Sequence, residues 1–268
     1  MATVLGYHYS NFHQLERENM IVQMSKKTAP LALAGLIAMS LAACGGGGGG
    51  ASPGNSTAAT VVTSVPVQQG LAYAFTHGMQ SSLAISGSTS SGSVTYPLSG
   101  TLTYTLGAAV NATFNGVAAM QATETISGTL TGNGVTQPLS ISSPLYVNAQ
   151  YAPIGSNEPG NYCVATSTAG YPASATAGQS GDLASYNCYS DSTKRTLVAT
   201  QKITYVTTAG DDSNSLNVQM LSTVYDGSNK LQGSVSTTYS ITTAGVPKLI
   251  RLQMSEVVDG ISISIDAR

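Results

Sequence analysis

The sequence has few charged residues, and basic residues are the scarcest of them. Charged residues make up 8% of the chain, against about 25% in typical soluble domains. Hydroxyl side chains must therefore provide much of the contact with water. No Lys or Arg occurs between Lys27 and Lys194, so no basic patch in this stretch can neutralise phosphates. We predict that nucleic acid is not a partner.

Histidine is also scarce, which limits hydrolytic chemistry. Beyond the first 43 residues the chain keeps a single histidine, His77. A serine nucleophile needs a base to take its proton, and no Gly-x-Ser-x-Gly motif occurs. We interpret His77, which precedes Gly78, as a turn residue. We predict no catalytic residues, no cofactor and no enzymatic activity.

The N-terminal segment has the order of a secretory signal. Lys26 and Lys27 precede an apolar stretch, residues 29–43, that ends in small residues, which is the order of a charged region, an apolar region and a cleavage site. Fifteen residues in a helix span about 22 Å, less than the roughly 30 Å of a hydrocarbon core. A transmembrane helix is therefore the less favoured interpretation.

The last four residues of this segment, Leu41-Ala42-Ala43-Cys44, resemble the lipobox of bacterial lipoproteins. The resemblance implies cleavage before Cys44, diacylation of its sulfur and usually acylation of the new N-terminus. Two or three acyl chains make a stable anchor. In such lipoproteins of Gram-negative bacteria, Asp after the acylated Cys commonly retains the protein at the inner membrane. Gly45 occupies that position, which favours the outer membrane, at its periplasmic face or at the cell surface.

These features divide the chain into four segments. Residues 1–23 form an upstream extension, since translation from Met20 or Met24 would give an ordinary leader. Residues 24–43 form the signal peptide, and residues 44–69 form a lipidated flexible linker that is rich in Gly, Ser and Thr. Residues 70–268 form the folded domain. The expected partners are the membrane, through the acyl chains, and the machinery that processes and sorts lipoproteins.

Three cysteines occur in the chain, and the lipobox uses one of them. The other two, Cys163 and Cys188, form an even pair in an oxidising compartment. We predict a disulfide between them, with two free buried thiols as the alternative. The spacing is not Cys-x-x-Cys and histidine is scarce, so we predict no metal site.

The folded domain has the pattern of β-structure. From Leu231 to Ile241, apolar and polar residues alternate, which predicts a strand with one buried face. Asp226-Gly227 precedes this strand and predicts a hairpin, and Asp259-Gly260 predicts a second one. Asn115-Gly116 and Asn133-Gly134 mark two more turns. We find no helix signal.

The predicted fold class is all-β. We expect an antiparallel meander of about ten strands that forms a sandwich or a partly open barrel, and we favour these over a transmembrane barrel. Weak similarity between residues 99–121 and 180–201 leaves two related β units as an alternative to chance resemblance in a sequence of low complexity.

Two carboxylates stand at positions where the alternation predicts apolar residues. Glu124 shares parity with Met120 and Ile126, and Glu256 shares parity with Met254. Burial would raise their pKa values and make them candidate ligand-binding or acid–base groups. The alternative is a bulge or a rim position that lets each one reach water. Asp211-Asp212 could contribute to a calcium loop, but it lacks EF-hand spacing, so we interpret it as a solvated turn.

Three functions remain open at this point. The first is a non-enzymatic outer-membrane lipoprotein whose β domain binds or scaffolds a partner. The second is a carrier of a lipid or another apolar ligand inside the β domain. The third is an envelope hydrolase, which would need Glu124 and Glu256 to converge within roughly 5 to 9.5 Å.

Overall fold

The computed structural model describes residues 64–258 and 260–268. This part of the chain forms one antiparallel sheet of thirteen strands and one helix, α3 (Val67–His77), which confirms the all-β prediction. The strands are β1 (Met79–Ser91), β2 (Val94–Leu106), β3 (Val110–Phe114), β4 (Val117–Gly132), β5 (Val135–Val147), β6 (Pro153–Glu158), β7 (Asn161–Thr168), β8 (Ser180–Tyr189), β9 (Leu197–Ala209), β10 (Ser215–Asp226), β11 (Leu231–Thr242), β12 (Pro247–Val258) and β13 (Ile261–Ala267).

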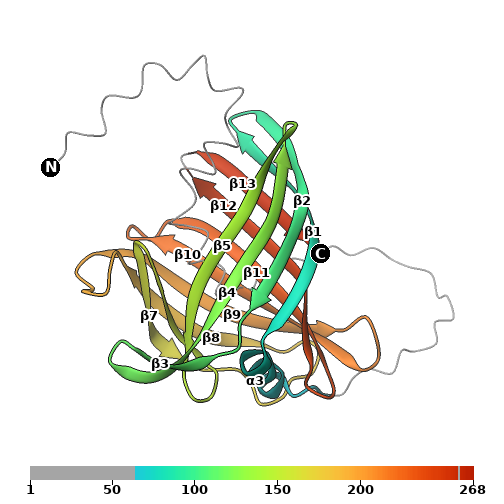
Figure 1. Ribbon diagram of the computed structural model, residues 1–268, viewed down its shortest axis with the longest axis vertical. Coiled ribbons are helices and arrows are strands. Elements are labelled where there is room, and N and C mark those ends of the chain that lie inside the picture. Colours follow the sequence, from blue (N-terminus) through green and yellow to red (C-terminus); the bar gives the residue numbers. More distant parts are fainter. Residues whose placement is uncertain (1–63, 259) are drawn as a thin grey trace.

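The sheet closes into a barrel (Figure 1). From β4 to β13 each strand pairs with the next one along the chain, β13 pairs with β1, and β2 pairs with both β1 and β4. Twelve strands form the wall, and β3 is an additional strand that pairs with β4. The sandwich, the partly open barrel and the count of about ten strands were wrong. All thirteen strands belong to one sheet.

The physical reason for this error is that closure depends on pairs of distant segments. Ile85 on β1 lies opposite Ala267 on β13, and Leu102 on β2 lies opposite Gly128 on β4. Alternation of apolar and polar residues shows which face of a strand is buried, but it does not show which strand lies beside it. The sequence pattern therefore predicted the faces and left the partners open.

Glycines on β1, β2 and β4 permit the sharp curvature at the closure. A Cβ atom on Gly100 would overlap the carbonyl oxygen of Thr129, and one on Gly128 would overlap that of Thr101. A Cβ atom on Gly87 would likewise overlap the carbonyl oxygen of Ser264 on β13. Glycine in a strand marks such close approaches of backbone to backbone. These positions allow the wall to bend where the first strands meet the last one.

The predicted turns are present. Asn115-Gly116 joins β3 to β4, and Asn133-Gly134 joins β4 to β5. Both residues of each pair have positive φ, 50° and 81° in the first and 50° and 76° in the second, as a two-residue type I′ turn requires. The predicted hairpins of β10 with β11 and of β12 with β13 are also confirmed.

Helix α3 is a correction to the sequence analysis, which found no helix. Its buried residues include Val67, Leu71, Ala74 and Phe75, a spacing that places them on one helical face. Gly70 masked this pattern, because glycine disfavours helix interiors. The helix packs against β11 and β12 at the lower end of the barrel (Figure 1), which we call the helix end. Among the described residues, no helix combines the length and hydropathy needed to cross a membrane.

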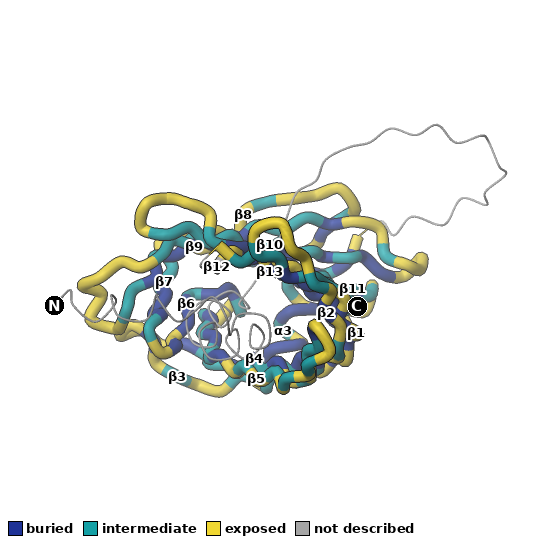
Figure 2. The backbone as a smooth tube through the Cα atoms, turned by 90° about the horizontal axis from the view of Figure 1, so that it is seen from above, coloured by how far each residue is buried: buried dark blue, intermediate teal, exposed yellow. Residues whose placement is uncertain are grey.

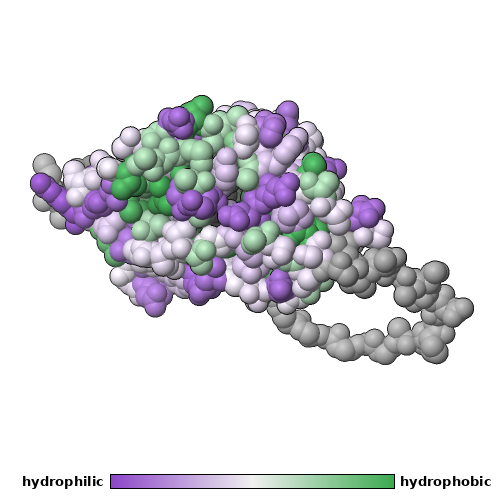
Figure 3. Space-filling view, turned by 90° about the horizontal axis from the view of Figure 1, so that it is seen from below, coloured by the Kyte–Doolittle hydropathy of each residue, from purple (hydrophilic) through white to green (hydrophobic). Residues whose placement is uncertain are grey.

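The connections β1–β2, β4–β5, β6–β7, β8–β9, β10–β11 and β12–β13 lie on the opposite side of the barrel, and we call this the hairpin end. Successive side chains of a strand point to opposite faces of the sheet, which here are the lumen and the outer surface. Figure 2 shows the strands from above as a ring around the lumen. On β11, for example, Val235, Tyr239 and Ile241 are buried inside, whereas Ser234 and Ser240 face outward. Seen from below, the face at the helix end carries weakly polar and strongly hydrophilic side chains, with hydrophobic side chains gathered over one part of it (Figure 3).

A small second core lies outside the barrel wall. The β3–β4 hairpin carries Phe114, which stacks on Tyr146 of β5 at 4.3 Å between ring centroids and lies 5.2 Å from Tyr162 of β7. Gly155 on β6 leaves room for the Phe114 ring, since a Cβ atom there would overlap it. This hairpin therefore folds over the outer face of β5, β6 and β7.

Candidate functional site

On β5 and β10 the inward-facing side chains become more exposed towards the hairpin end, whereas on β1 and β12 they stay buried there. On β5, the inward-facing residues from Ser143 to Val147 are buried, whereas those from Val135 to Ile141 are half-buried. Burial decreases in the same direction along β4 and β10. Half-buried apolar residues that face inward near this end are Leu130, Leu139, Ile141, Val224 and Ile261. The helix end is thus packed, and the hairpin end exposes an apolar lining.

Two tyrosines meet across the middle of the lumen. The hydroxyl groups of Tyr104 on β2 and Tyr239 on β11 are 3.4 Å apart, although three strands separate β2 from β11 in the sheet. The Tyr104 hydroxyl donates to Oε1 of Glu124 at 2.6 Å. Because a phenol has one proton, Tyr239 is the donor in the contact with Tyr104. The result is a directed chain from Tyr239 through Tyr104 to Glu124.

A second carboxyl group lies beside the first. Ser143 on β5 stands directly opposite Glu124 on β4, and its hydroxyl donates to Oε1 of Glu158 on β6. The Oε2 atoms of both glutamates are buried and have no hydrogen-bond partner among the described residues. We call Tyr104, Glu124, Ser143, Glu158 and Tyr239 the tyrosine–glutamate centre.

Burial changes the acidity of this centre. Burial of Glu124, opposed by the hydrogen bond from Tyr104 and reinforced by the charge of Glu158, raises its pKa to about 8. Burial raises the pKa of Glu158 to about 7, against the opposing hydrogen bond from Ser143. Desolvation also raises the pKa of Tyr104. At neutral pH Glu124 is therefore mostly protonated and can act as a neutral donor or acceptor.

Glu256 lies nearer the hairpin end. It is 3% exposed on β12, and burial raises its pKa to about 7. Its neighbours across the sheet are Gly233 on β11 and Ile263 on β13. No hydrogen bond joins its carboxyl group to another residue in the described ranges. The burial expected from its parity is confirmed, as it is for Glu124, which is 4% exposed.

Glu124 and Glu256 stand on strands that are not neighbours in the sheet, β4 and β12. The cross-strand neighbours of Glu124 are Leu106 and Ser143, and those of Glu256 are Gly233 and Ile263. The charge that acts on Glu124 is that of Glu158. The geometry therefore pairs Glu124 with Glu158 and does not favour the two-carboxylate hydrolase of the sequence analysis.

Sequence reasoning missed Glu158, Tyr104 and Tyr239 as members of a site. Glu158 precedes Pro159-Gly160, which reads as a turn, so nothing local predicted its burial. The tyrosines read as ordinary strand residues, because Tyr favours strands. Only the parity of Tyr104 and Tyr239 along their strands signalled that they face inward.

The basic side chains of the described ranges lie outside the lumen. Lys202 forms an exposed ion pair with Asp182 at 2.9 Å, and Arg251 forms two hydrogen bonds with Asp266 at 2.7 and 3.0 Å. The exposed His77 ends α3 and approaches the carbonyl oxygen of Tyr73 at 3.1 Å.

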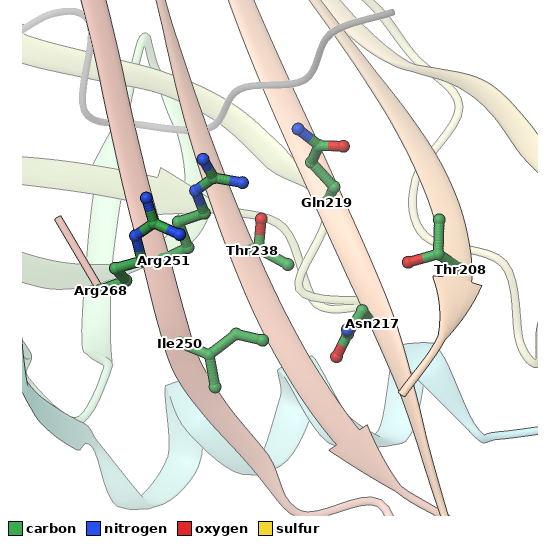
Figure 4. A pocket seen from close by; sticks show the side chains of 7 residues that line it. All are labelled: Thr208, Asn217, Gln219, Thr238, Ile250, Arg251 and Arg268. Atoms are coloured by element: carbon green, nitrogen blue, oxygen red, sulfur yellow. The ribbon is translucent and has the colours of Figure 1, made fainter. Parts of the chain in front are cut away.

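A shallow groove of about 290 Å³ crosses the outer wall over β9, β10, β11 and β12 (Figure 4). Residues that line it are Thr208, Asn217, Gln219, Thr238, Ile250, Arg251 and Arg268. Its side chains project from the outward face, so the groove is separate from the lumen. Asp266 holds both arginines, with Arg268 at 3.1 Å, and neutralises part of their charge.

The cysteines and the acidic loop at Asp211-Asp212 were the other positions singled out from the sequence. Cys163 on β7 and Cys188 on β8 are directly opposed and form the predicted disulfide. Cys44 lies outside the described residues. Asp212 accepts a hydrogen bond from the backbone N–H of Asn214 at 2.8 Å, as in a local turn. Within the described ranges, no group of three or more His, Cys, Asp or Glu residues could hold a metal ion.

No family model, curated protein or solved structure matches the chain. The interpretation of the lumen therefore depends on its own geometry.

Proposed function

We propose that this chain is a non-enzymatic, lipid-anchored binding protein of the outer membrane that holds an apolar ligand in its barrel lumen. The observation that carries the proposal is the half-buried apolar lining at the hairpin end. Eight strands enclose a lumen that side chains can fill or that holds one small ligand, and a larger number of strands widens it. Twelve strands, packed at the helix end and accessible at the other, can accommodate an apolar molecule.

The position of the anchor supports this proposal. Acyl chains on Cys44 attach the protein to the membrane, and the linker that follows leads to the described domain. That domain begins at the helix end, where Val65 pairs with Ala175 and α3 follows. The hairpin end is thus opposite to the end at which the described part of the chain begins. Besides the membrane, the protein meets the lipoprotein processing and sorting machinery during export.

The composition of the inner wall supports binding rather than scaffolding alone. A structural barrel is most stable with a uniformly apolar interior, because each buried carboxyl group costs free energy. Glu124, Glu158 and Glu256 all face inward instead. Polar groups set in an apolar lining are typical of ligand pockets, where they orient the ligand.

Two matched variants test the proposal. Leu139 faces inward on β5 and the adjacent Ser140 faces outward, so Leu139→Trp fills the mouth of the lumen and Ser140→Trp leaves it open. We expect mass spectrometry of solvent extracts to find an apolar molecule with the wild type and with Ser140→Trp. Its amount should fall at least fivefold with Leu139→Trp.

Circular dichroism would verify that both variants keep the β fold of the wild type. Equal amounts of extracted molecule from the two folded variants, or none from the wild type, would overturn the proposal.

A further inference from the structure

The ionisable side chains with shifted pKa values that face the lumen are all acids and phenols. Glu124, Glu158 and Glu256 are 4%, 5% and 3% exposed, whereas Lys202 and Arg251 project from the outer wall and pair with Asp182 and Asp266 there. An anionic ligand would meet like charge in this lumen without a compensating cation. The inner wall is therefore electrostatically suited to a neutral or cationic ligand.

Glu256 is the acid whose sheet row includes part of the half-buried apolar lining. Gly233 separates it from the half-buried Val224 in the same row of the sheet, and the missing side chain leaves the carboxyl group beside the accessible lining. The other two acids lie at the tyrosine–glutamate centre, where Tyr104 and Tyr239 close the lumen.

A second unpartnered polar group stands close to Glu256 in the same row. Thr89 on β1 lies opposite Ile263, which in turn lies opposite Glu256. Thr89 is 1% exposed, and its Oγ1 has no hydrogen-bond partner among the described residues. Buried polar groups are normally paired, so two such groups in one row indicate a place where an external donor completes the hydrogen bonding.

We propose that Glu256 binds the ammonium group of an apolar amine, with Thr89 as a second acceptor. This proposal rests on the proposed function, since it presumes an apolar ligand in the lumen. An ammonium group supplies three donors and a positive charge, and a charge-assisted hydrogen bond in a poorly solvated site is stronger than a neutral one. An alcohol with the same chain would gain the hydrogen bond without the charge.

Three ligands with the same chain and different head groups test the inference. Dodecylamine, dodecanol and dodecanoate would be titrated by calorimetry into the full chain carrying Cys44→Ser, below their micelle-forming concentrations. We expect dodecylamine to bind at least tenfold more tightly than dodecanol, and dodecanoate to bind most weakly. Glu256→Gln, which keeps the shape of the side chain, should reduce the preference for the amine to less than threefold and leave dodecanol unchanged.

Asp182→Asn is the matched control, because it removes a carboxyl group that is exposed on the outer wall, where it pairs with Lys202. It should keep the preference for the amine.

The affinity for dodecylamine should also rise between pH 6 and pH 8, because Glu256 loses its proton near pH 7 while an amine like that of lysine stays protonated. The sheet neighbours Gly233 and Ile263 do not titrate, and Glu124 and Glu158 would contribute equally in wild type and Glu256→Gln.

The outcomes separate the two proposals. If none of the three ligands binds, the proposed function fails together with the inference. If all three bind with similar affinity, or if Glu256→Gln keeps the preference for the amine, the lumen still binds apolar ligands and the role of Glu256 is refuted.

Discussion

At the scale of single residues, the lumen is defined by carboxyl groups that the fold keeps out of water. Glu124 accepts a hydrogen bond from Tyr104 on one oxygen, and its other oxygen has no partner among the described residues. Such a group is less costly to bury in its neutral form than in its charged form. The raised pKa of Glu124, about 8, expresses this cost. It also links the stability of the fold to pH.

Glu124→Gln should flatten this pH dependence. In the folded state the pKa of Glu124 lies above its unfolded value of 4.5. The contribution of its protonation to the free energy of unfolding is therefore fully present below about pH 4.5. It is lost as pH rises to about 8, at about 1.4 kcal/mol per pH unit. Urea unfolding of the wild type and the variant should agree near pH 4, and at pH 9 the variant should be more stable by a few kcal/mol.

Asp182→Asn serves as a control, because Asp182 is exposed and pairs with Lys202 at the surface. It should leave the pH profile close to that of the wild type. Parallel profiles for Glu124→Gln and the wild type would contradict the assignment of the pH dependence to this carboxyl group.

At the scale of elements, two features make the barrel possible and asymmetric. Glycines such as Gly100 allow β1, β2 and β4 to curve sharply where the sheet closes, and α3 fills the helix end with its apolar face. The hairpin end has tight turns and lacks a comparable helix in the described part of the chain. This asymmetry produces the gradient of burial along the lumen.

Gly100→Ala should weaken the closure. The added methyl group would overlap the carbonyl oxygen of Thr129 on β4, and forced backbone shifts of this kind cost about 1–3 kcal/mol. We expect a lower midpoint of urea unfolding than for the wild type. Thr101→Ala changes the adjacent, outward-facing residue and should alter the stability by less than about 0.5 kcal/mol. Equal effects of the two substitutions would refute the role of Gly100 in curvature.

At the scale of the whole molecule, the proposed function joins an anchor at one end of the barrel to an opening at the other. Outward-facing residues of β1 and β13 include Ser82, Ser86, Ser262 and Ser264, whereas most buried apolar side chains belong to the core inside the barrel. Acyl chains on Cys44 are the proposed means of membrane attachment.

Cys44→Ser should release the protein from the membrane fraction and abolish labelling with palmitate. The physical reason is that each buried methylene contributes about 0.8 kcal/mol to membrane affinity, and the substitution removes every acyl chain. A variant with both Cys163→Ser and Cys188→Ser loses the disulfide and keeps Cys44, so it should stay in the membrane fraction and be labelled. Persistent labelling of Cys44→Ser would refute the anchor.

The local features of the sequence determined much of the fold. Alternation identified the buried face of β11, Asn-Gly pairs identified the turns after Phe114 and Gly132, and an even number of remaining cysteines identified the disulfide. Parity alone placed Glu124 and Glu256 among buried residues. These inferences succeed because each depends on a few neighbouring residues, whose conformational preferences act over two to four positions.

Only the tertiary structure decided the number of strands, the closure of the barrel and which side chains meet inside the lumen. Tyr104 and Tyr239 are 135 positions apart in the sequence, and Glu158 reaches Ser143 because β5 and β6 lie side by side. The pairing of β1 with β13 closes the ring over an even longer separation. Periodicity carries no information about such partners, because any strand with one apolar face can pair with any other. Their choice depends on how the whole sheet curves around a shared interior.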